Sequence, residues 1–180
     1  MTRIKSLALS GVFAGLTLAL MWTGSFLPYM DYALPATAGA LTLLLVLELS
    51  GVWALGVYAA VAALALLLLP AKGVPLLYAM FFGYYPVLRH VLGSKCPKWL
   101  TWALKFLAFN AAMVTAYWLA VKVLNIELED FGPTFGKYAK AIMLALGNVT
   151  FLLYDKMILA AFELIYERRW RKRLRHLMRG

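Results

Sequence analysis

The chain has 180 residues, of which 64% are hydrophobic and only 14% are charged, whereas soluble domains carry about 25% charged residues. A soluble domain of this length has too little interior to bury so much apolar surface, which excludes an ordinary soluble protein. The net charge of +10 does not indicate a nucleic-acid-binding protein, because seven of the eighteen basic residues lie together between Arg168 and Arg179, directly after an apolar run. The composition predicts an integral membrane protein, and the length suits a single domain, residues 1–180.

Six apolar runs predict an all-α integral membrane protein with six transmembrane helices. Each run is near the ~20 residues that a membrane-spanning helix needs. The connections between the runs are short, so consecutive helices are expected to be antiparallel neighbours. The runs cover residues 7–27, 33–49, 52–69, 75–92 and 99–124, and the sixth starts near residue 137 and crosses the membrane by about residue 159.

Basic residues predict the orientation, because cytoplasmic segments of membrane proteins carry an excess of Lys and Arg. With the N-terminus in the cytoplasm, fourteen of the eighteen basic residues are cytoplasmic and four are external. Both termini and the loop that holds Cys96 are then cytoplasmic, and the acidic loop 127–136 is external. Residues 160–180 are expected to continue as a basic, amphipathic cytoplasmic helix that binds anionic lipids. The alternative is that this tail docks a partner protein.

The first apolar run carries two columns of small residues at four-residue spacing, and each column lies on one face of a helix. Helices in lipid associate through close backbone packing, which small residues allow. In one interpretation the columns pack against a helix of the same chain. In the other, Ser10, Gly11, Ala14 and Gly15 form the interface with another membrane subunit. The columns are Gly11, Gly15, Ala19 and Thr23, and Ser6, Ser10 and Ala14.

A six-helix chain of this size with LALSGVFAGLTLAL in its first helix resembles an S component, the substrate-binding membrane subunit of energy-coupling factor (ECF) transporters. The first helix of S components typically carries an Ala-x-x-x-Ala pattern that contacts the coupling membrane subunit. Here the matching positions read Ser10-x-x-x-Ala14 and Gly11-x-x-x-Gly15. Residues 34–55 also resemble the second and third helices of such subunits. The resemblance implies uptake of a vitamin-like small molecule together with a coupling membrane subunit and two ATPase subunits.

The fourth run contains Pro86, which is expected to kink the helix, and Gly83, which leaves room for the bend. The kink either shapes a cavity or is harmless, since proline is tolerated in membrane helices. The neighbouring Tyr84 and Tyr85 are expected near the middle of the membrane, where their hydroxyl groups need hydrogen-bond partners.

Polar residues within the last three runs predict a substrate site in the outer half of the protein, capped by the loops 28–34 and 127–136. An aromatic wall, two amides at the floor and one cation at the entrance suit a partly apolar anion. The alternative is that Asn110 and Asn148 only join the fifth and sixth helices. The predicted substrate-binding residues are Tyr84, Tyr85, Asn110, Tyr117, Asn148 and Lys140.

Three charged residues, Arg89, Lys105 and Asp155, fall at a similar depth near the inner surface. The short side chain of Asp155 cannot reach water from a buried position, whereas Lys and Arg can extend toward the interface. The common depth predicts a structural ion pair between Asp155 and Lys105 or Arg89. The alternative is that both basic side chains extend to the interface by themselves.

The residues do not predict an enzyme, a metal site or a bound cofactor. Catalysis in a membrane usually needs paired acids, a His-rich metal site, or a Ser or Cys beside a base, and the sequence shows no such set. It also has no nucleotide-binding motif and no inverted repeat of the kind that transporters carry. Together with the resemblance, these absences favour binding of a small-molecule substrate as the membrane subunit of an ECF-type transporter, in the plasma membrane of a bacterial-type cell. The alternative is a non-transporting membrane accessory or assembly protein, or a lipid-handling protein.

Overall fold

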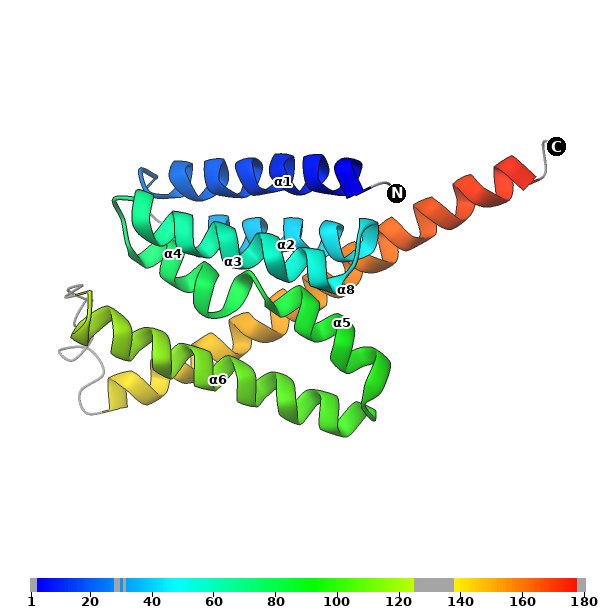
Figure 1. Cartoon of the computed structure of the whole chain (residues 1–180). Helices are drawn as coiled ribbons and strands as arrows, with labels where there is room; N and C mark the ends of the chain where they lie inside the picture. Colours follow the sequence, from blue (N-terminus) through cyan, green and yellow to red (C-terminus); the bar gives the residue numbers. More distant parts are fainter. Residues whose placement is uncertain (1–2, 28–29, 31, 125–137, 178–180) are drawn as a thin grey trace.

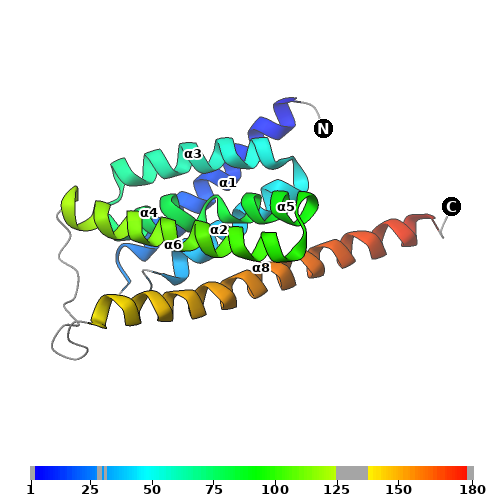
Figure 2. The same cartoon turned by 90° about the horizontal axis from the view of Figure 1, so that it is seen from below.

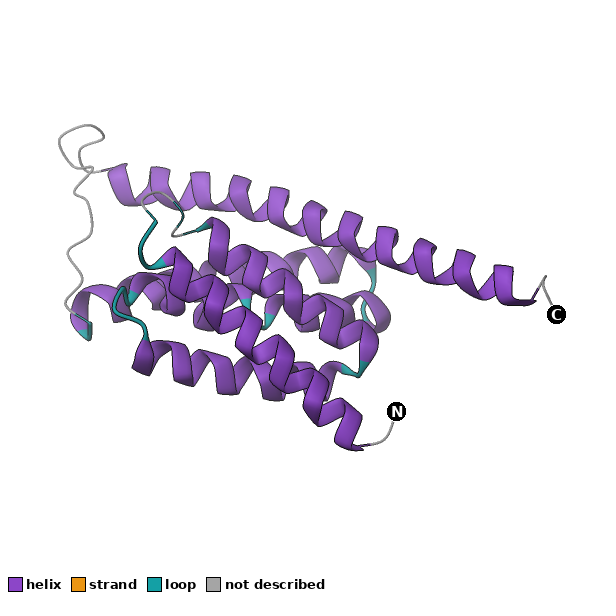
Figure 3. Cartoon of the chain, turned by 90° about the horizontal axis from the view of Figure 1, so that it is seen from above, coloured by secondary structure: helices purple, strands orange, loops and turns teal. Residues whose placement is uncertain are grey.

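The computed structural model describes residues 3–27, 30, 32–124 and 138–177, and within these ranges every regular element is a helix (Figure 3). The helices follow the six apolar runs, and the fourth run forms three consecutive pieces, of which η1 is a π-helix. The elements are α1 Arg3–Gly24, α2 Ala33–Glu48, α3 Gly51–Leu68, α4 Gly73–Leu77, η1 Tyr78–Phe82, α5 Tyr85–Lys95, α6 Lys98–Lys122 and α8 Ala139–Leu177.

Successive segments run back and forth along one direction, and α4, η1 and α5 together make one pass (Figure 1). The two ends of the chain lie at the same end of the molecule in this view. Short connections enforce this arrangement, because a two- or four-residue loop can only return the chain alongside the helix that it leaves. Helix α1 packs against α2 and α3, and α6 packs against η1 and α8.

Within the described residues, four helices are long and apolar enough to cross a membrane: α1, α3, α6 and the part Ala141–Leu164 of α8. Helix α2 is apolar but has only 16 residues, which corresponds to about 24 Å, against ~30 Å for the hydrocarbon core of a bilayer. These lengths and compositions are compatible with a multi-pass membrane protein. The prediction of an all-α fold is thereby confirmed, and the number of six spans stays a prediction.

The interrupted fourth pass forms the centre of the core. Tyr78, Phe81 and Tyr85 are completely buried there, among side chains from α2, α6 and α8. The ring of Phe81 lies 5.0 Å from that of Phe109 in α6 and 5.7 Å from that of Phe151 in α8. Tilted and edge-to-face ring pairs of this kind stabilise a core beyond the area that they bury. The aromatic residues of the fourth run therefore hold the later helices around it.

The fourth pass differs from the expected helix with a kink at Pro86. The π-helix brings the backbone N–H of Gly83 to the carbonyl of Tyr78 at 2.8 Å, and the chain then turns before α5 begins at Tyr85. Pro86 consequently lies in the first turn of α5, where no backbone N–H donor is needed. Gly83 is required at the break because a Cβ there would overlap the ring of Tyr58.

Helix α8 continues far beyond the other helices and carries the C-terminus away from the bundle (Figure 2). It extends from Ala139 to Leu177, so the predicted helical continuation past residue 160 is present in the backbone. The side chains of residues 165–177, which hold most of the basic tail, lie outside the described residues. The predicted lipid contact of the tail stays a prediction.

Candidate functional site

A buried cluster of polar side chains joins α5, α6 and α8. Nε of Arg89 donates a hydrogen bond to Oδ1 of Asp155 at 2.8 Å, and Nζ of Lys105 donates to the same oxygen at 2.7 Å. The hydroxyl of Tyr85 also donates to this oxygen. Asp155 is 3% exposed and Lys105 is 4% exposed. The structure thus brings together the three residues predicted as a structural ion pair.

Tyr85 is the member of this cluster that the sequence interpretation placed elsewhere, in the substrate site. It precedes Arg89 by one helical turn, so the two side chains leave α5 on the same face. That spacing is the signal in the sequence that could have assigned Tyr85 to the cluster. A carboxylate oxygen that accepts bonds from two cations and a hydroxyl is held in its charged form and in one orientation. The cluster therefore fastens three helices to one another at a single point.

The two amides within the spans form a reciprocal pair between α6 and α8. Nδ2 of Asn110 donates to Oδ1 of Asn148 at 3.0 Å, and the reverse bond has the same length. Each amide also donates to the carbonyl one turn earlier in its own helix, that of Phe106 or Leu144, at 2.8 Å. Both N–H groups of both amides are thereby used. The geometry corresponds to the interpretation in which these residues join two helices.

The remaining predicted substrate-binding residues do not meet at one place in the described part of the chain. The half-buried ring of Tyr84 lies 5.9 Å from that of Tyr58 in α3. Tyr117 is 45% exposed on α6. The side chain of Lys140 lies outside the described residues, as do the loop 127–136 and part of the loop 28–34. A substrate site that includes these residues stays a prediction.

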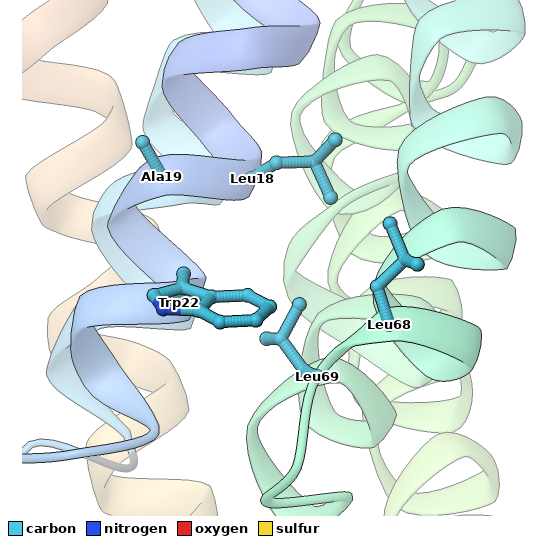
Figure 4. A pocket seen from close by; sticks show the side chains of 5 residues that line it. All are labelled: Leu18, Ala19, Trp22, Leu68 and Leu69. Carbon is cyan, nitrogen blue, oxygen red and sulfur yellow. The ribbon is translucent and has the colours of Figure 1, made fainter.

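An apolar groove lies between the end of α1 and the end of α3, where the sequence interpretation expected no site (Figure 4). Its volume is about 210 Å³, and its accessible lining is entirely apolar. A lining without accessible polar atoms suits a hydrocarbon chain better than a polar ligand. Apolar side chains at two helix ends carry no distinctive sequence signal for such a groove. The lining residues are Leu18, Ala19, Trp22, Leu68 and Leu69.

The two columns of small residues on α1 face different surroundings. A Cβ added at Gly11 or Gly15 would have no other atom within 4 Å, so this column faces away from the rest of the described chain. In the other column, Ser10 is 6% exposed and Ala14 packs against the core. Of the four residues predicted as a partner interface, two are therefore on the outer surface and two are in contacts within the chain.

Within the described residues, no group of three or more His, Cys, Asp or Glu side chains is placed to hold a metal ion. Comparisons of this chain with protein-family models, with curated protein sequences and with solved structures gave no match. The function is therefore inferred from the geometry of the chain itself.

The amide pair allows a test that separates a role in helix packing from a role in substrate binding. Asn110→Leu or Asn148→Leu alone leaves one amide without its partner, and each is expected to lower the free energy of unfolding by about 0.6–1.7 kcal/mol. The double variant should recover part of this loss, because neither amide is then left unpaired. Thermal unfolding in detergent measures the stability of all three variants. A double variant that is stable and yet binds the ligand that copurifies with the wild-type protein more weakly would show that both amides belong to the substrate site.

Proposed function

We propose that this chain is the substrate-binding membrane subunit of an ECF-type uptake transporter. The observation that carries the proposal is the outward-facing column of small residues on α1. Gly11 and Gly15 leave a smooth strip on a helix that is apolar enough to cross a membrane. A second membrane helix can approach such a strip closely and gain many van der Waals contacts. The proposed partners are a coupling membrane subunit on this strip and two ATPase subunits, which supply the energy.

The proposed topology has six passes, with α2 and the α4–η1–α5 segment added to the four long apolar helices. The alternating direction of the segments and the common end of the two termini support an even number of passes (Figure 1). The excess of basic residues at that end supports a cytoplasmic location for both termini. The short α2 is tolerated in this arrangement because α1, α3 and η1 surround it.

Cys96, which is the single cysteine of the chain, provides the test of this orientation. It lies at the end of α5, on the side proposed to be cytoplasmic. A membrane-impermeant thiol reagent is expected to label it in permeabilised cells but not in intact cells. As a control, a cysteine placed at position 130 of a Cys96→Ser variant should be labelled in intact cells. Labelling of Cys96 itself in intact cells would reverse the orientation.

The proposed substrate is a vitamin-like or other small, partly apolar molecule that enters from outside. The aromatic side chains in the last three passes support an apolar ligand, because flat or greasy molecules gain most from such walls. Tyr84, Tyr117 and Lys140 remain the residues proposed to meet it. Mass spectrometry of molecules retained after mild detergent extraction identifies the ligand class.

The strip on α1 predicts opposite results for two matched substitutions. Gly15→Leu adds bulk to the outer column, so it should leave the chain folded but abolish copurification with the coupling subunit. Ser10→Leu adds similar bulk one column away, where the side chain is buried, and should lower the thermal unfolding temperature. Fluorescence-detected size exclusion separates folding from assembly. A Gly15→Leu variant that assembles and transports like the wild type would contradict the proposed interface.

A lipid-handling protein is the second candidate, because the apolar groove between α1 and α3 would hold a hydrocarbon chain (Figure 4). A stoichiometric phospholipid or fatty acid that copurifies with the chain would favour this function. A polar micronutrient together with ATPase subunits would favour the transporter subunit.

A further inference from the structure

The buried cluster of Arg89, Lys105 and Asp155 carries more positive than negative charge. It holds two cations and one carboxylate, a net charge of +1. Among the ion pairs of the described residues, Asp155 is the acid that contacts Arg89 and Lys105. An uncompensated charge in a low-dielectric site is costly, so a buried cation normally has a counter-ion. Within the described part of the chain, one positive charge of the cluster is therefore left without a counter-ion.

The hydrogen-bond donors of the cluster are also in excess. A guanidinium has five N–H donors and an ammonium has three. Among the described residues, Nε of Arg89 and one donor of Lys105 are engaged by Asp155, and both bonds end on the same oxygen, Oδ1. The terminal nitrogens of Arg89 make no hydrogen bond to another described residue, and they are not completely buried. The Arg89 side chain is 16% exposed. Its free edge can therefore be reached from outside the cluster.

In the proposed topology, the cluster lies just below the level of the lipid phosphate groups. Trp99 and Trp102 are 73% and 41% exposed near the start of α6, as expected for side chains at a membrane–water interface. Lys105 follows Trp102 by three residues, or about 4.5 Å along the helix. Its Nζ lies 4.9 Å from the centre of the Trp102 ring. A headgroup phosphate at that level can approach the exposed part of the Arg89 side chain, beside the ammonium of Lys105.

We propose that Arg89 and Lys105 form a binding site for a phosphate-bearing anion at the α5–α6 end of the bundle. The free edge of the Arg89 guanidinium presents two N–H donors in the fork that matches two phosphate oxygens. The ammonium of Lys105 contributes the second charge. Bound phosphate brings the cluster to neutrality and uses the excess donors. The phosphate belongs to an anionic phospholipid or to a free anion, and these two sources share the same chemistry at the site.

The test uses the full-length protein in neutral detergent, titrated with short-chain phosphatidylglycerol and followed by native mass spectrometry. Arg89→Gln and Lys105→Met each leave one cation opposite Asp155, so each makes the cluster neutral without the anion. Both are expected to bind the lipid about tenfold more weakly than the wild type. Two routes to the same neutral cluster keep the test informative when one variant fails to fold.

Lys156→Gln is the matched control for lipid binding. Lys156 follows Asp155 directly in α8 but is exposed and outside the cluster. The Lys156→Gln substitution also removes one positive charge, but outside the cluster, so it should change the affinity for the lipid less than about twofold. The basic tail is unchanged in all the variants and contributes equally to each. Equal lipid binding by folded Arg89→Gln, Lys105→Met and wild-type protein would overturn the proposal, unless phosphate binding identifies a free anion as the ligand.

Inorganic phosphate, added to the protein in phosphatidylcholine nanodiscs, distinguishes the two sources of the anion. Thermal stabilisation by phosphatidylglycerol that Arg89→Gln removes, without an effect of inorganic phosphate, identifies a lipid. Stabilisation by inorganic phosphate that Arg89→Gln removes identifies a free anion, and both results support the site. A wild-type protein that neither anion stabilises would overturn it directly.

Discussion

Asp155→Asn is expected to lower the free energy of unfolding by about 3–5 kcal/mol, because it leaves the buried Lys105 and the partly buried Arg89 without their carboxylate. Nζ of Lys105 and Nε of Arg89 both end on Oδ1 of Asp155, so no other described group takes over the negative charge. Thermal unfolding in detergent, followed by size exclusion, measures the loss. Because the cluster joins α5, α6 and α8, the loss should appear as unfolding of the whole bundle.

Two controls show whether the loss of stability is specific to the ion pair or follows from any substitution in α8. Lys156→Gln changes the neighbouring exposed position and should alter the free energy of unfolding by less than about 0.5 kcal/mol. The double variant Asp155→Asn, Lys105→Met removes one of the two cations that Asp155→Asn leaves without a carboxylate. It should therefore recover part of the lost free energy of unfolding. An Asp155→Asn protein as stable as the wild type would show that the ion pair does not support the fold.

Gly39→Ala is expected to lower the free energy of unfolding by about 2–3 kcal/mol through overpacking. A Cβ at this position in α2 would overlap the carbonyl oxygen of Phe82 and would lie 2.7 Å from the hydroxyl oxygen of Tyr154. The carbonyl belongs to the backbone of η1 and cannot rotate away as a side chain can. The added methyl group therefore forces α2 away from the centre of the core.

Gly56→Ala in α3 is the matched control for this substitution. A Cβ at Gly56 would have no other atom within 4 Å, so alanine there should raise the free energy of unfolding by up to about 1 kcal/mol through its higher helix propensity. Opposite shifts of the unfolding temperature for the two variants are expected in the same detergent. Equal shifts would mean that α2 does not approach η1 as closely as the structure shows.

The positions of the helices could be predicted from the sequence because helix formation depends on local features. Apolar runs of spanning length are visible within a few residues of the chain. The four long candidate spans lie within or around predicted runs. The interruption of the fourth run was predicted at the wrong residue. The ring of Tyr58, which packs against Gly83 at the interruption, belongs to another helix and cannot be foreseen from the fourth run itself.

The sequence by itself determined which segments are helical and that their surfaces are too apolar for water. It also placed Asp155, Lys105 and Arg89 at one depth, because depth follows from counting residues along each helix. Only the tertiary structure decided which neighbours meet. Ser10 and Gly11 are adjacent in the chain, yet one packs inside and the other faces outward. Rotation about a helix axis is set by packing against other helices, and lipid provides no polar face that would reveal it in the sequence.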